Sequence, residues 1–402
     1  MEIIRELCSF EGRLAGTDAE RRAANRLAER LREGGRRAEI EPTYVHPQWA
    51  LVHAVHCLLG FAGSLVAIEI PALGFGLVLA AATSMYLDLN YRLYLVRSLF
   101  FRRASQNVVS PGRNPEARAR LIICAHIDAG RGGAVYNPKR ARRLARLGKR
   151  YPWLGPMRIL FWSLAFLLPI LGARMAGVES GALSLLQLLP TLVLLLGVFA
   201  LAEIQLSNAV PGANDNASGV ATTLSIAGEL DAEPPANLDV WVVLAGAEET
   251  LQEGMRAFVR SQRKQLDPAS TFFVAIDSVG RGEVRFETAA GWAVSYHMDR
   301  RLIELASAIA ESDGANGDRF RAEPLRRGSA GESMPPRIAG FRSVGITCRD
   351  ADGYVPDSHL ASDLPQAIDT GSLERAHGFT LELIRRLDRD LDRRAEAGIT
   401  PR

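Results

Sequence analysis

Four long apolar segments interrupt a chain of 402 residues. They cover residues 49–68, 71–89, 157–175 and 181–202 and form two close pairs. A membrane-spanning helix needs about 20 mostly apolar residues, a length that the last segment exceeds and that the other three barely reach. Trp, Tyr and Arg gather at the segment ends, as is typical of membrane interfaces. We therefore expect four transmembrane helices in two hairpins, with buried helices of a large soluble protein as the alternative.

The charge around these segments predicts their orientation. The connector inside each pair is nearly uncharged, whereas the flanking stretches 21–37 and 137–150 are rich in arginine. The positive-inside rule then places all flanks in the cytoplasm and both short connectors outside. We expect a multi-pass protein of the cell membrane, in contact with the lipid bilayer, whose polar part is cytoplasmic.

Outside the apolar pairs, short apolar runs alternate with stretches of helical periodicity. Runs at 120–127, 238–245, 271–277 and 341–349 predict buried strands, each followed by polar residues. Residues 217–230 have the period of a helix. Buried strands that alternate with helices favour an α/β fold with a mostly parallel central sheet and helices on both faces.

Composition and charge argue against several classes of function and partner. The net charge is only +3, and no basic tract is interleaved with aromatic residues, so we expect no nucleic-acid partner. The N-terminus carries charges throughout, which excludes a signal peptide and predicts a helix capped by Thr17 or Asp18. The cysteines lack CxxC spacing, and we expect reduced structural thiols. They are Cys8, Cys57, Cys124 and Cys348.

Histidines and acids stand at the ends of the predicted strands. Taken singly they fit ordinary roles, such as a helix N-cap or turn residue for Asp215. Together they indicate a site, because the carboxyl ends of parallel strands share one edge where ligands bind. Imidazole and carboxylate without thiolate suit zinc, manganese or cobalt in an open catalytic site. The candidates are His126, Asp128, Asp215, Glu248, Glu249, Asp277 and His359.

The motifs around these residues resemble those of the M28 family of zinc peptidases. AHIDAG, PGANDNASGV, AGAEE, IDSVG and PDSHLASD occur in the order of that family and cover nearly the whole chain outside the apolar pairs. The resemblance implies a zinc-exopeptidase fold. It also implies a metallopeptidase with a peptide substrate, most simply an aminopeptidase that hydrolyses N-terminal peptide bonds, and the apolar pairs would anchor it in the membrane.

The resemblance further implies two zinc ions per chain that act together. Asp215 would be the carboxylate that bridges both ions. His126 and Glu249 would complete the ligands of one ion, and Asp277 and His359 those of the other. Two ions about 3.5–4 Å apart need such a short bridging carboxylate between them.

Two catalytic roles come from the same resemblance. Glu248 would take a proton from water and return it to the leaving amine. Asp128, two residues beyond His126 on a strand, would accept a hydrogen bond from the imidazole and fix its tautomer. The Glu-Glu pair continues as TLQEGM (250–255), which departs from the usual sequence of the family in this loop.

This assignment divides the chain into a peptidase domain with two insertions. His126 lies between the insertions and the other ligands follow the second, so they meet only if each insertion returns the chain to the side it left. Hairpins do so. The predicted parts are peptidase segments 1–48, 91–156 and 205–388, hairpins 49–90 and 157–204, and a charged tail 389–402.

Three other functions remain open. A single-zinc relative that cyclises N-terminal glutamine would use the same acids, and metal stoichiometry separates it from a peptidase. A non-catalytic receptor or scaffold of the same fold would not need the complete set of ligands. A transporter would need more charges inside the apolar segments. Within the first segment, His53 and His56 are either a metal pair or packing residues.

Overall fold

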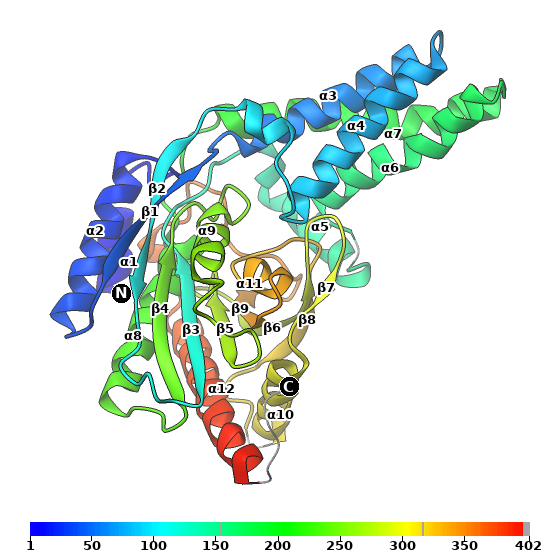
Figure 1. Ribbon diagram of the computed structural model, residues 1–402. Helices are drawn as coiled ribbons and strands as arrows, with labels where there is room; N and C mark the ends of the chain where they lie inside the picture. Colours follow the sequence, from blue (N-terminus) through cyan, green and yellow to red (C-terminus); the bar gives the residue numbers. More distant parts are fainter. Residues whose placement is uncertain (153, 316, 397–402) are drawn as a thin grey trace.

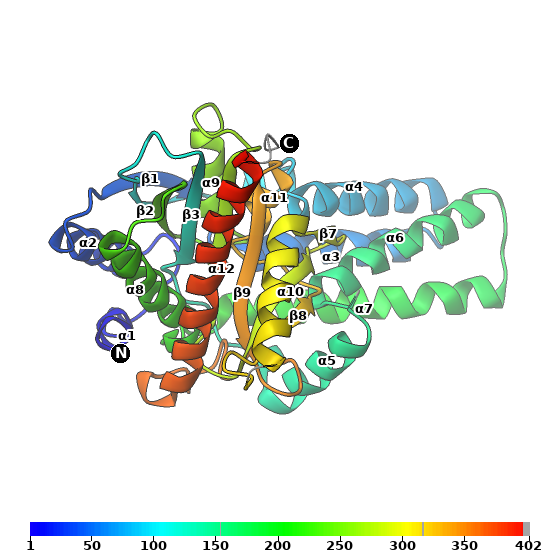
Figure 2. The ribbon, with the colours of Figure 1, turned by 90° about the horizontal axis from the view of Figure 1, so that it is seen from below.

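The computed structural model describes residues 1–152, 154–315 and 317–396. Within this part of the chain, a sheet of nine strands forms the centre, helices cover both faces, and four long helices project together from one end (Figures 1 and 2). The strand order is β1-β2-β4-β3-β5-β9-β6-β7, with β8 paired to β6. The predicted α/β fold with helices on both faces is confirmed.

The four strands predicted from sequence form the centre of this sheet and run parallel. Their residues are almost continuously apolar and are buried on both faces, as is typical of parallel strands under helices. They are, in spatial order, β4 (Leu238–Ala245), β3 (Ala119–His126), β5 (Thr271–Ile276) and β9 (Arg342–Arg349).

The flanking strands make the sheet mixed, so the prediction of a mostly parallel sheet is wrong. On one side β1 and β2 pair antiparallel with each other and β2 with β4; on the other, β6 pairs antiparallel with β9 and β7. Several of these strands alternate polar and apolar residues, which left no apolar run to detect. They are β1 (Glu39–Val45), β2 (Arg103–Ser110), β6 (Glu283–Ala290), β7 (Tyr296–His297) and β8 (Glu323–Arg326).

The hydroxyl of Thr17 accepts a hydrogen bond from the Glu20 amide and caps the helix α2 (Asp18–Glu33), which settles the predicted choice between Thr17 and Asp18.

More helices cover one face of the sheet than the other. One face carries α1 (Glu2–Cys8), α2 (Asp18–Glu33), α8 (Gly219–Ala232), α10 (Arg300–Ala315) and α12 (Thr370–Glu396). The other carries α9 (Glu253–Gln262) and α11 (Met334–Ile338). The predicted tail 389–402 lies on α12 as far as Glu396, and its remaining residues lie outside the described ones.

The four projecting helices are long and apolar enough to cross a membrane. They lie side by side in both views (Figures 1 and 2) and close to the predicted bounds, except that the last continues to Leu206. On that helix Leu185, Leu189, Leu196 and Phe199 are each about two-thirds exposed or more, an apolar surface suited to lipid. The helices are α3 (Trp49–Val66), α4 (Pro71–Leu89), α6 (Pro156–Met175) and α7 (Gly181–Leu206).

Polar contacts join the two hairpins to each other. Nε2 of Gln187 on α7 donates to the carbonyl oxygen of Ser64 on α3 at 2.6 Å, and the hydroxyls of Ser64 and Thr191 are 2.6 Å apart. Such hydrogen bonds between apolar helices fix their register. Short elements complete the connections: η1 (Val96–Leu99), η2 (Ala134–Tyr136), α5 (Pro138–Arg150) and η4 (Pro365–Ala367).

A buried ion pair anchors the first hairpin to the sheet domain. Nε of Arg97 lies 3.1 and 2.9 Å from the two carboxylate oxygens of Asp88, at the end of α4. Both side chains are buried. His53 Nε2 is 3.9 Å from Asp88, and His56 Nε2 bonds the Ser84 hydroxyl at 2.8 Å. Among the described residues neither histidine joins a group of metal-binding donors, which favours the packing role.

We expect Asp88→Asn to destabilise the protein strongly, because it removes the nearest carboxylate from the buried Arg97 guanidinium and leaves only Glu253, at 3.6 Å from Nη1. Removing one partner of a buried ion pair costs about 3–5 kcal/mol. The double variant with Arg97→Met should recover much of this loss. Thermal unfolding in detergent measures the effect, and Arg21→Gln, in an exposed pair with Asp18, is the matched control. An unchanged unfolding midpoint in Asp88→Asn would contradict the anchoring role.

Candidate metal centre

The carboxyl edge of the parallel strands gathers the candidate residues, as the sequence predicted. His126 is the last residue of β3, and Asp277 directly follows β5. Glu248 and Glu249 lie in the loop after β4. Asp215 reaches the same place from the turn η3 (Ala213–Ser218), where its peptide bond to Asn216 is cis.

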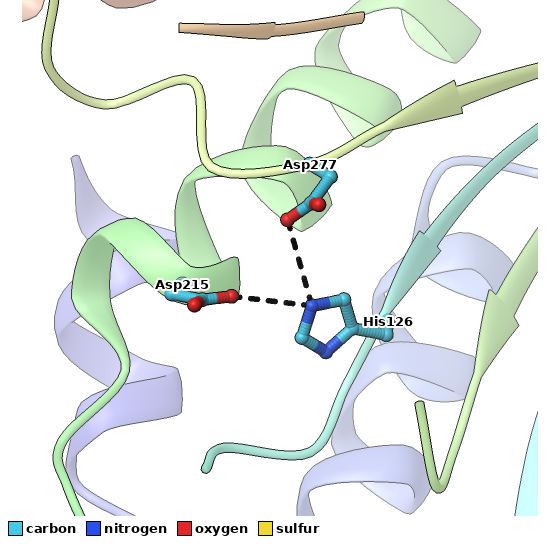
Figure 3. Close-up of side chains that lie close together, drawn as sticks. All are labelled: His126, Asp215 and Asp277. Carbon is cyan, nitrogen blue, oxygen red and sulfur yellow. Dashed lines mark ion pairs between the residues drawn. The ribbon is translucent and has the colours of Figure 1, made fainter. Parts of the chain in front are cut away.

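Two groups of three donor atoms meet there. In the first, Nε2 of His126 lies 3.4 Å from Oδ1 of Asp215 and 3.7 Å from Oδ1 of Asp277 (Figure 3). In the second, Nε2 of His359 lies 4.0 Å from Oδ2 of Asp215 and 3.7 Å from Oε2 of Glu249. Within each group the donor atoms all lie within 4.8 Å of one another. Asp215 thus contributes to both groups.

The pairing of ligands implied by the resemblance is wrong in one respect. It grouped His126 with Glu249 and Asp277 with His359, whereas the structure groups His126 with Asp277 and Glu249 with His359. The reason lies in the sheet. The register of β3 and β5 places Asp277 level with His126, whereas Glu249 lies four residues beyond Ala245, the residue of β4 that pairs with His126.

Both imidazoles are oriented by backbone carbonyl groups. Nδ1 of His126 lies 3.1 Å from the carbonyl oxygen of Asp128, and Nδ1 of His359 lies 2.9 Å from that of Arg131. A carbonyl oxygen only accepts, so Nδ1 carries the proton in each ring. Nε2 is therefore the ring nitrogen that faces Asp215 and that a metal ion would take as its ligand.

Asp128 does more than the sequence suggested. Its carboxylate Oδ1 lies 3.4 Å from Nδ1 of His126, next to the carbonyl contact. The two carboxylate oxygens also accept the backbone amides of Glu248 and Glu249, each at 3.0 Å. Asp128 thereby ties the strand that ends in His126 to the loop that carries both glutamates.

Two residues that sequence reasoning missed hold Asp215. The carboxylate of Asp363 accepts the amides of Asn214 at 2.6 Å and of Asp215 at 3.1 Å. The Ser358 hydroxyl donates to Oδ2 of Asp215 at 2.6 Å. Both lie in the motif PDSHLASD, in which the sequence pattern points only to the histidine.

The loop after β4 has a strained backbone and is held by side chains from other segments. Ala247, Leu251 and Gln252 have φ between 53° and 65°, a region that residues other than glycine rarely adopt. Nε2 of Gln252 donates to Oε1 of Glu248, while its Oε1 accepts from the Tyr91 hydroxyl and, at 3.0 Å, from Nε1 of Trp292. Two donors on one oxygen fix the orientation of this amide, so its nitrogen faces Glu248.

The centre concentrates negative charge. Burial, with the charges of Asp277 and Asp128, raises the pKa of Glu248 to about 7. Burial also raises the pKa of Glu249 and of Glu332, a further buried acid whose oxygens have no hydrogen-bond partner among the described residues. Burying this many ionised carboxylates costs free energy unless cations neutralise them. The set of donor atoms therefore fits divalent metal ions.

A cavity of about 110 Å³ opens beside the second donor group. Glu249 and His359 form part of its wall. Trp49 at the start of α3 and Ile204 near the end of α7 form another part. The hairpins therefore reach the space next to the candidate metal centre.

Solved structures share this fold over nearly the whole chain. A Zn-dependent exopeptidase from Parabacteroides distasonis is 13% identical, with a TM-score of 0.53 and 96% of each chain covered. A glutaminyl cyclase from Bacteroides thetaiotaomicron is 14% identical, with a TM-score of 0.53 and 96% of this chain and 95% of that chain covered. A leucine aminopeptidase precursor from the same organism is 14% identical, with a TM-score of 0.52 and 96% and 94% covered. These likenesses establish the fold.

Part of the sequence is similar to a known protein family. No curated protein matches the chain. Residues 203–384 match the model of peptidase family M28. That segment contains Asp215, Glu248, Glu249, Asp277 and His359, whereas His126 precedes it. This match, with the order of the motifs, shows that residues 203–384 are similar to peptidase family M28.

Proposed function

We propose that this protein is a membrane-anchored, zinc-dependent metallopeptidase, an aminopeptidase that hydrolyses N-terminal peptide bonds with two zinc ions. The observation that carries the proposal is the pair of donor groups that share Asp215. Each group offers one imidazole and two carboxylates, a ligand set that suits zinc in an open catalytic site. A Zn-dependent exopeptidase and a leucine aminopeptidase precursor among the structural relatives support the same reaction.

In this proposal His126 and Asp277 hold one ion, Glu249 and His359 hold the other, and Asp215 is shared. Zinc, when bound, acidifies a bound water and polarises a carbonyl group. Within the chain, Nδ1 of each imidazole is protonated and held by a carbonyl oxygen, so the ligand atoms are oriented before any ion arrives.

Glu248 acts as general base and acid in this mechanism. Its raised pKa suits a group that takes a proton from water and returns it to the leaving amine near neutral pH. The Gln252 amide holds the carboxylate of Glu248 in place. Asp128 positions the backbone beneath it through the amides of Glu248 and Glu249.

The four projecting helices anchor the enzyme in the bilayer with the catalytic domain in the cytoplasm. Their length and apolar character support the anchoring. The arginine-rich flanks support the orientation through the positive-inside rule.

A glutaminyl cyclase-like reaction is the second candidate, because the glutaminyl cyclases resemble this fold as closely as the exopeptidase does. The products separate the two reactions. Hydrolysis releases a free amino acid from a dipeptide, whereas cyclisation acts only on N-terminal glutamine and releases ammonia.

We expect Glu248→Gln to retain its metal and its thermal stability but to lose at least about 10²-fold in kcat, since a positioned general base contributes about 10²–10⁴-fold. A panel of dipeptides on detergent-solubilised protein, with products separated by chromatography, measures the rate. Chelator-treated wild-type protein is the control for metal dependence. Full activity of Glu248→Gln would overturn the assigned role, and activity that survives metal removal would overturn the proposed function.

We expect Gln252→Leu to lower kcat by about 10- to 100-fold with little change in KM, because a hydrogen bond to a charged group contributes about 1.5–3 kcal/mol. Gln252→Glu should lose the same donor while keeping the acceptor for Tyr91 and Trp292. Gln265→Leu, on an exposed side chain, is the matched control. Steady-state kinetics and metal analysis on the same samples distinguish a positioning effect from a loss of metal. A wild-type kcat in Gln252→Leu would contradict the role of Gln252 in positioning Glu248.

A further inference from the structure

The cavity beside the second donor group has a charged wall that the proposed mechanism does not use. Arg103, the first residue of β2, and Arg131, in the loop after β3, both line it together with Glu249 and His359. Among the described residues, no carboxylate lies within ion-pair distance of either guanidinium. The acid in the cavity wall, Glu249, is already assigned to the metal centre.

The two arginines place two positive charges on the wall of one cavity. Burial and the positive charge of Arg103 lower the pKa of Arg131. Nη1 of Arg131 donates to the carbonyl oxygen of Ser207, just beyond α7, at 2.7 Å. The guanidinium carbon of Arg103 lies 5.6 Å from the centre of the Phe101 ring. Two like charges near each other without an acid are stabilised when an anion lies between them.

The position of Arg131 relative to the metal centre is fixed by the backbone. Its carbonyl oxygen contacts Nδ1 of His359 at 2.9 Å. The preceding residue, Gly130, approaches the ligands so closely that a Cβ there would lie 2.5 Å from the His359 ring and 2.6 Å from Oε1 of Glu249. The guanidinium of Arg131 therefore extends from a segment that rests against the second donor group.

The cavity is small. Its volume of about 110 Å³ favours a short substrate over a long peptide. Its wall is completed by the hairpin ends, through Trp49 and Ile204. A guanidinium binds a carboxylate through two parallel hydrogen bonds, which makes arginine well suited to the end of such a peptide.

We propose that Arg103 and Arg131 bind the C-terminal carboxylate of a short peptide whose N-terminal residue lies at the metal centre. The substrates of this site are then di- and tripeptides with a free carboxylate. This inference rests on the proposed aminopeptidase function and gives it a substrate class.

The test compares each dipeptide of a panel with its C-terminal amide, on the full chain in phosphatidylcholine nanodiscs. We expect kcat/KM of the wild type to be about 10- to 100-fold higher for the free acid, the value of a hydrogen-bonded ion pair. Arg131→Gln and Arg103→Gln should each bring the ratio of acid to amide toward one, mainly through KM. Arg131→Lys should restore part of the ratio, and Arg102→Gln, on an exposed neighbour outside the cavity, should keep it.

The outcomes separate this proposal from the one on which it depends. Equal hydrolysis of acid and amide by the wild type overturns the carboxylate subsite but leaves the aminopeptidase. A ratio that survives in both glutamine variants also overturns it. Failure to hydrolyse either form overturns the proposed function and the subsite with it. If nanodiscs containing phosphatidylglycerol abolish the wild-type ratio, a lipid headgroup phosphate occupies the arginines and the peptide assignment is wrong.

Discussion

The candidate site depends on one carboxylate that must reach two sets of partners at once. Asp215 presents one oxygen to His126 and the other to His359. Burial opposes its ionisation, but the two imidazoles hold the pKa of Asp215 below its ordinary value. The fold secures this position through Asp363 and Ser358, whose contacts fix the turn and the carboxylate in it. The surrounding acids can remain ionised only if cations balance them, which is why geometry and charge lead to the same hypothesis.

The first hairpin is connected to the loop after β4 as well as to the other projecting helices. Nη1 of Arg97 donates to the carbonyl oxygen of Thr250 at 3.2 Å, next to Glu249. A second connection runs from Tyr91, just after α4, through Gln252 to Glu248. The strained loop after β4 is thus braced from the segment that leaves the hairpin. In this protein the insertion supports the geometry of the site in addition to its proposed role as an anchor.

Sequence patterns identified what depends on local periodicity or on a motif. The apolar helices, the four central strands and the residues at their ends were all found this way. The antiparallel flanks were missed because β1 and similar strands are half exposed and lack a continuous apolar run. The grouping of His126 with Asp277, and the supports from Asp363 and Gln252, depend on contacts between distant segments. The unusual continuation TLQEGM was the one local sign that this loop is held differently.

The measurement that tests the shared carboxylate most directly is the zinc content of purified variants, determined by elemental analysis. The account predicts about two zinc ions per wild-type chain, about one in Asp277→Ala, and a loss of both in Asp215→Ala, as a bridging ligand requires. Thermal unfolding of the same samples checks that each variant is folded. A wild-type chain that binds one ion, or a folded Asp215→Ala variant that retains the wild-type content, would contradict the central claim.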